Sequence, residues 1–85
     1  MAYTVIIKPA AERELRRLGP EIQLRLQPHI ADLARDPRPP GYKKLVGLGG
    51  LYRIRVGDYR VVYEVRDEVL LVLVVKIGHR SRIYG

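Results

Sequence analysis

The order of apolar and polar positions divides the 85-residue chain into one strand, two helices and three further strands. Residues 3–7 are rich in β-branched and aromatic side chains, which favours a first strand. Pro9 suits the first turn of a helix, and apolar residues at helical spacing predict a helix that stops at Gly19-Pro20. A second stripe at helical spacing runs from residue 22 to residue 33. The proline-rich residues 36–41 predict an irregular connector to the remaining strands.

The strongest alternation lies in residues 51–65, read as LYRIRVGDYRVVYEV, and predicts a β-hairpin. Gly57-Asp58 has the chemistry of a two-residue type II′ turn. With that turn, Arg55 lies directly opposite Arg60, and Arg53 shares their face. Like charges at opposite positions destabilise a hairpin, so folding alone does not favour this arrangement. A phosphate group would explain it, because guanidinium groups bind phosphate through paired donors.

Residues 69–77 are apolar at almost every position, which is typical of a strand inside a sheet. The predicted fold is therefore a single α+β domain spanning residues 1–85, with the order β-α-α-β-β-β. We expect a small antiparallel sheet with both N-terminal helices packed on one face. The arginines of the hairpin would then line the opposite face.

Composition narrows the class of partner. The formal net charge is +7, with 12 Arg and 4 Lys, and residues 41–85 carry +5 of it. Such a basic surface suits nucleic acid or an acidic protein, although it can also be an ordinary solvated surface. There is no cysteine, no cluster with metal-ligand spacing and no apolar run of membrane-spanning length. We therefore expect a cytoplasmic protein that needs no metal or cofactor.

The end of the chain adds the most specific motif. Residues 77–84 read IGHRSRIY, and this tail would bring Arg80 and Tyr84 back beside the hairpin. Together with Lys44-Leu45 and the hairpin, this motif makes residues 3–84 resemble the RelE/ParE superfamily of bacterial and archaeal toxins. For the RelE branch, the resemblance implies a type II toxin–antitoxin system. The toxin would be a ribosome-dependent endoribonuclease (mRNA interferase) that cuts mRNA in the decoding site, and a cognate antitoxin would cover its basic face.

The resemblance also implies which side chains act. The positions that match the catalytic set of the family are Arg53, Arg55, Arg60, Arg80 and Tyr84. The first two are often lysine in the family. We further expect four basic residues to bind RNA, namely Lys43, Lys44, His79 and Arg82.

Metal-independent attack by the ribose 2′-OH needs a base, charge stabilisation at phosphorus and protonation of the leaving oxygen. Because arginine does not lose its proton, Arg53, Arg55 and Arg60 are assigned to binding the phosphate. Tyr84 is the candidate base, or a platform on which a nucleobase stacks. Arg80 would stabilise the scissile phosphate or assist the leaving group, and His79 is an alternative acid or base.

Two other functions stay open at this point. The ParE branch implies a non-enzymatic inhibitor of DNA gyrase, but members of that branch generally lack the catalytic set. A passive RNA-binding module is the third reading. Inhibition of gyrase without RNA cleavage would favour the ParE-like reading.

Overall fold

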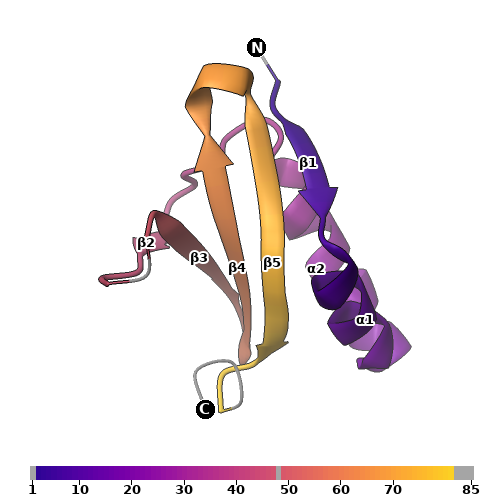
Figure 1. Cartoon of the computed structure of the whole chain (residues 1–85). Helices are drawn as coiled ribbons and strands as arrows, with labels where there is room; N and C mark the ends of the chain where they lie inside the picture. The colour runs from indigo at the N-terminus through magenta and orange to yellow at the C-terminus, as the bar shows by residue number, and fades with distance from the viewer. Residues whose placement is uncertain (1, 48, 82–85) are drawn as a thin grey trace.

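The computed structural model is a five-stranded sheet with both helices on one face (Figure 1). It describes residues 2–47 and 49–81. The sheet order is β1-β5-β4-β3-β2. The elements are β1 (Thr4–Ile7), α1 (Pro9–Arg17), α2 (Pro20–Asp32), β2 (Lys43–Lys44), β3 (Leu51–Val56), β4 (Tyr59–Arg66), the 3-10 turn η1 (Asp67–Val69) and β5 (Leu71–His79).

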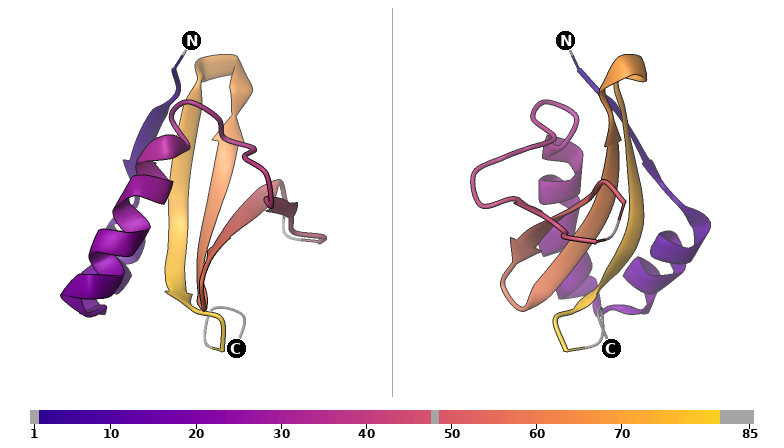
Figure 2. Two further views of the ribbon diagram at one scale, coloured as in Figure 1. Left: turned by 180° about the vertical axis from the view of Figure 1, so that it is seen from behind. Right: turned by 60° about the vertical axis from the view of Figure 1, so that its left-hand side comes forward.

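The predicted α+β class is confirmed, but the sheet is mixed rather than wholly antiparallel. β1 pairs in parallel with β5, with Thr4 opposite Leu71 and Ile7 opposite Val74. The alternation of side chains marks each strand but does not say which strands become neighbours. The two helices and the connector carry the chain across one face (Figure 2), and this path lets the first and last strands lie side by side.

The core lies between the helices and one face of the sheet. Pro9 and Pro20 begin the two helices, where a missing N–H costs nothing. Each helix buries the apolar stripe that the sequence predicts, including Ala11 and Leu15 of α1 and Leu26 of α2. In the part of the chain that the structure describes, no helix is long and apolar enough to cross a membrane.

A β-bulge in β5 sets which of its side chains reach the core. Val62 of β4 pairs with Lys76, but the next residue of β4 pairs with Val74, so Val75 is an extra residue. Strict alternation would have turned Lys76 inward with Val74. The bulge instead buries both Val74 and Ile77 and leaves Lys76 exposed.

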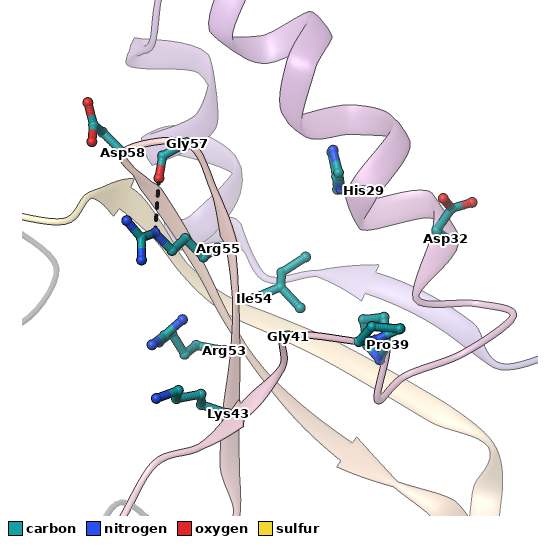
Figure 3. Close-up of a pocket in the computed structure, with 11 residues that line it drawn as sticks. His29, Asp32, Pro39, Gly41, Lys43, Arg53, Ile54, Arg55, Gly57 and Asp58 are labelled. Atoms are coloured by element: carbon teal, nitrogen blue, oxygen red, sulfur yellow. Dashed lines mark hydrogen bonds between the residues drawn. The ribbon is translucent and has the colours of Figure 1, made fainter.

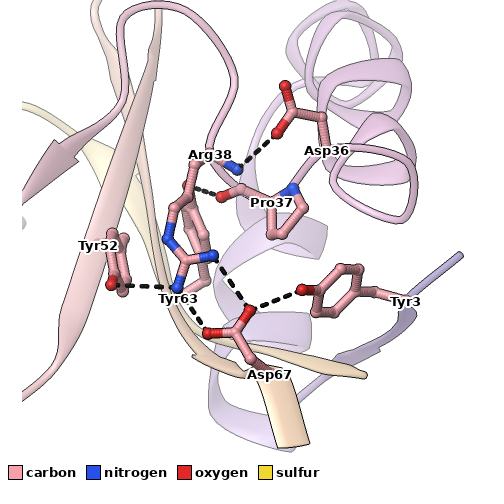
Figure 4. A network of polar contacts seen from close by, with 7 residues as sticks. All are labelled: Tyr3, Asp36, Pro37, Arg38, Tyr52, Tyr63 and Asp67. Carbon is pink, nitrogen blue, oxygen red and sulfur yellow. Dashed lines mark hydrogen bonds and ion pairs between the residues drawn. The ribbon is translucent and has the colours of Figure 1, made fainter. Parts of the chain in front are cut away.

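An ion pair anchors the connector to the sheet (Figure 4). The guanidinium group of Arg38 donates to Oδ1 of Asp67 at 3.1 Å and to Oδ2 at 2.8 Å. It also donates to the hydroxyl of Tyr52 at 3.3 Å and lies over the Tyr52 ring. The hydroxyl of Tyr3 donates to Asp67 Oδ1 at 2.6 Å. Arg38 first and Tyr3 second lower the pKa of Asp67 to about 2.

Stacked tyrosines continue this anchor toward β2. The buried hydroxyl of Tyr63 donates to the carbonyl of Pro37 at 2.7 Å (Figure 4), and burial raises the pKa of that hydroxyl. The Tyr63 ring stacks on Tyr52, and the Tyr52 ring contacts Tyr42. The residue after Tyr42 is Lys43, so these contacts hold the short strand β2 in place.

Candidate nucleic-acid interface

The hairpin of β3 and β4 gathers three arginines on the face of the sheet away from the helices. Its turn is as predicted, with Gly57 at φ +60° in the first turn position. The register places Arg55 opposite Arg60 and Arg53 opposite Val62. Because cross-strand partners share a face, all three guanidinium groups leave the sheet on the same side.

Arg60 is partly buried, although it is a cation of the hairpin. Its Nε and Nη1 atoms are buried. Its direct neighbour on β3, Arg55, is exposed and donates from Nε to the carbonyl of Gly57 at 3.4 Å. A partly buried cation beside a second cation creates a strong positive potential, because screening by water is weaker there. This potential favours an anionic ligand.

Strand β2 adds one lysine to this face and turns the other away. Lys43 pairs with Arg53, whereas Lys44 pairs with Tyr52, whose ring packs against the core. Figure 3 shows the side chains of Lys43, Arg53 and Arg55 in a row on one side of β3, and Ile54 on the other. Of the two lysines expected to bind RNA, the structure therefore brings only Lys43 to the arginines.

A cleft of about 750 Å³ lies beside this row, between β3, the connector and the C-terminal part of α2. Asp32 and His29 of α2 face the cleft from the helix side (Figure 3). Strand β2 covers only two residues of β3, so the remaining edge of β3 borders the open cleft. The cleft therefore combines cationic side chains with an accessible strand edge.

Arg80 lies next to the hairpin turn, as the sequence predicts. Its backbone N–H donates to the carbonyl of Asp58 at 2.8 Å. Its Nε lies 3.9 Å from Oδ1 of the same residue. The turn therefore anchors the segment that follows β5 near Arg55 and Arg60.

The structure separates His79 from the arginines. His79 pairs with Tyr59, and the two rings meet edge to face at 5.5 Å. Tyr59 packs against the core, so His79 is on the helix side of the sheet. Its Nδ1 accepts from the Ser81 N–H at 3.2 Å and lies 2.8 Å from Ser81 Oγ. Tyr84 and Arg82 lie outside the described residues, and their assigned roles stay predictions.

Lys76 is a basic residue of this face that the sequence reasoning missed. It pairs with Val62, which also pairs with Arg53. The row across the sheet is therefore Lys43, Arg53, Val62, Lys76. The apolar run around Lys76 hides the direction of its side chain, because only the bulge in β5 decides it. Among the described residues, no three His, Asp or Glu side chains gather in a way that could hold a metal ion.

Comparison with known families gives a match over nearly the whole chain. Residues 5–84 match the family described as "ParE toxin of type II toxin-antitoxin system, parDE". Toxin RelG of Mycobacterium tuberculosis is 34% identical over 85 residues, which is 99% of this chain and 98% of that protein. The mRNA interferase toxin RelE of Escherichia coli is 33% identical over 96% of this chain and 87% of that protein.

Solved structures agree in fold as well as in sequence. The M. tuberculosis toxin–antitoxin complex RelBE2 contains a chain that superimposes with a TM-score of 0.84 at 33% identity, covering 94% of this chain and 100% of that chain. The archaeal RelE–RelB complex of Pyrococcus horikoshii gives a TM-score of 0.82 at 32% identity, covering 96% of this chain and 99% of that chain. The chain is thus similar to RelE toxins over its full fold.

Proposed function

This chain belongs to the ParE toxin family of type II toxin–antitoxin systems and is a RelE-like toxin, and from that premise we propose that it is an endoribonuclease that cuts mRNA in the ribosomal decoding site. The name of its E. coli relative, an mRNA interferase, supports this reaction. The relatives solved with RelB support a cognate antitoxin as the partner that controls it.

The observation that carries the proposal is the cross-strand pair of Arg55 and Arg60, with Arg53 on the same face. The pair weakens the hairpin, so an anionic ligand is the natural reason for it. A phosphodiester offers four oxygens to planar guanidinium donors and gains charge as the reaction proceeds. Preformed cations therefore stabilise the transition state more than the substrate.

The proposed step needs no metal ion as its source of positive charge. The ribose 2′-oxygen loses its proton to a base and attacks phosphorus, and the bond from phosphorus to the 5′-oxygen breaks. The products are a 2′,3′-cyclic phosphate and a 5′-hydroxyl, which takes up one proton. Arg53, Arg55 and Arg60 bind the phosphate, and Tyr84 is assigned as the base. Arg80, which lies beside the hairpin turn, stabilises the departing oxygen.

The test is cleavage of a defined mRNA on purified ribosomes, with free mRNA in parallel and the new 5′ ends mapped by primer extension. We expect ends only at the decoding-site codon and only with ribosomes. Arg60→Ala should lower the rate by about 100-fold or more. Arg66→Ala is the matched control, because Arg66 lies on the same strand and pairs with Glu64 at 2.6 Å. Equal rates in both folded variants would refute the site.

Analysis of the product ends tests the chemistry separately. Attack by the 2′-oxygen leaves a cyclic phosphate, whereas attack by water activated at a metal pair leaves a different set of ends. A 5′-hydroxyl fragment and a 2′,3′-cyclic phosphate fragment are expected. A 5′-phosphate with a 3′-hydroxyl would contradict the proposed step even if cleavage occurs at the expected codon.

The second candidate is inhibition of DNA gyrase, which the match to the ParE family favours. A supercoiling assay on purified gyrase separates the two functions. Loss of supercoiling, together with intact mRNA on ribosomes, would replace the ribonuclease by a gyrase inhibitor. Cleavage of mRNA with unaffected gyrase would exclude the second candidate.

A further inference from the structure

Gly78 of β5 lies next to Arg60 on the basic face. It pairs directly with Arg60, so a side chain at this position would leave the sheet on the arginine side. An added Cβ atom would meet no atom of the described residues within 4 Å, apart from the chain neighbours. The described residues therefore leave the backbone of β5 partly exposed beside Arg60.

The fold does not require glycine here, in contrast to the turn. Gly57 has φ +60°, and a Cβ on it would lie 2.7 Å from Nη2 of Arg25. Gly78 has no positive φ and free space above it. Glycine weakens a strand relative to a β-branched residue, so its presence in β5 costs stability. A glycine inside a strand often marks a site where a ligand approaches the backbone closely.

Cations surround this bare position. Lys76 lies two residues before Gly78 on the same face, about 6.6–6.8 Å along the strand. Arg60 is the cross-strand neighbour, about 5 Å away between Cβ positions. Arg80 follows two residues after Gly78, beside the hairpin turn. Three cationic residues therefore lie around Gly78.

We propose that Gly78 is the floor of a phosphate-binding subsite, in which Lys76, Arg60 and Arg80 surround one phosphate of the RNA backbone. The inference rests on the proposed function, because it takes the ligand to be RNA. It adds Lys76 and Gly78 to the face, on the β5 side of the phosphate that Arg53, Arg55 and Arg60 bind. Glycine admits the phosphate because any side chain would occupy its volume.

The first test is binding without cleavage. A short 2′-O-methyl RNA oligonucleotide has no 2′-OH to attack, so it reports contact alone. We expect the amide resonance of Gly78 to shift on titration, together with that of Lys76, while the resonance of Gly19 in the helix connector stays in place. An unmoved Gly78 amide at the highest oligonucleotide concentration overturns the subsite, whether or not the protein cleaves mRNA.

The second test uses variants that keep the fold. Gly78→Ala and Gly78→Val should melt at or above the temperature of the parent protein, yet bind the oligonucleotide progressively more weakly, by about tenfold for valine, or about 1.4 kcal/mol. Gly19→Ala is the matched control, since Gly19 also lacks a positive φ and has no atom of the described residues within 4 Å. Binding of Gly78→Val equal to that of Gly19→Ala would overturn the proposal.

Salt dependence tests the role of Lys76. Each phosphate contact on a single strand contributes about 0.7 to the slope of log K against log salt concentration. Lys76→Gln should lower the slope by about that amount, and Lys76→Arg should restore it. On programmed ribosomes, Lys76→Gln should slow cleavage and Lys76→Arg should recover it. A slope unchanged by Lys76→Gln refutes the contact, and a parent protein that binds RNA without cleaving mRNA refutes only the ribonuclease.

Discussion

Reversing the charge of Arg55 should make the protein more stable while it destroys the basic face. Arg55 lies directly opposite Arg60, and two nitrogens of Arg60 are buried, so water screens this repulsion incompletely. Arg55→Glu replaces a repulsive cross-strand pair by an attractive one. Each such pair is worth roughly 0.2–1 kcal/mol, so the combined change is about 1 kcal/mol. In a domain of this size, that gain corresponds to an increase in Tm of about 4–8 °C.

The assay is thermal unfolding followed by circular dichroism at low salt and again in 1 M NaCl. The Debye length is about 3 Å at 1 M, so most of the gain should disappear there. Lys44→Glu is the control, because it makes the same change in net charge within the same sheet but lies opposite Tyr52. A melting temperature of Arg55→Glu below that of the parent protein at low salt, or a gain that persists unchanged in high salt, would show that repulsion between Arg55 and Arg60 does not weaken the hairpin.

Three further predictions concern the parts of the fold that hold the basic face in place. Asp67→Asn removes the carboxylate whose pKa Arg38 lowers to about 2. In melting curves, the variant should lose the full stability contributed by this carboxylate above pH 4, where the carboxyl of the unfolded chain is also ionised. The difference from the parent protein should become smaller as the pH falls toward 2. Tyr63→Phe leaves the carbonyl of Pro37 without its donor and should cost about 1–3 kcal/mol in urea unfolding, and a cost near zero would show that the carbonyl finds another donor. Leu26→Ala opens a cavity in the core and should cost about 2–5 kcal/mol in the same assay, unless the helices collapse onto the space.

The residues of the basic face should lower the stability of the protein, and this matters for its engineering. The substitutions that should stabilise this protein most simply, at Arg55 and Gly78, are also those that should remove binding. Proteins commonly keep such local costs at functional sites. A screen for stability alone would therefore select inactive variants at these two positions, and this expectation separates a functional surface from an ordinary solvated one.

Local patterns in the sequence determined both helices, the hairpin and every strand except the two-residue β2. A two-residue turn with glycine first allows one register, so the pairing of Arg55 with Arg60 followed from counting residues. The helical stripes likewise predicted Ala11 and Leu15 as core residues. These features depend on residues close together in the chain, and for that reason they can be read from the sequence.

Only the tertiary structure decided the rest of the basic face. Three features depend on neighbours far away in sequence. They are the parallel pairing of β1 with β5, the placement of Lys43 and Lys44 on opposite faces of the sheet, and the direction of the Lys76 side chain. An apolar run such as that of β5 carries no alternation, and one bulge reverses every side chain beyond it. The core requires both Val74 and Ile77 to be buried, and this is possible only with the extra residue Val75 between them. The same extra residue turns Lys76 outward, so packing of the core decides that Lys76 lies on the face of Arg60.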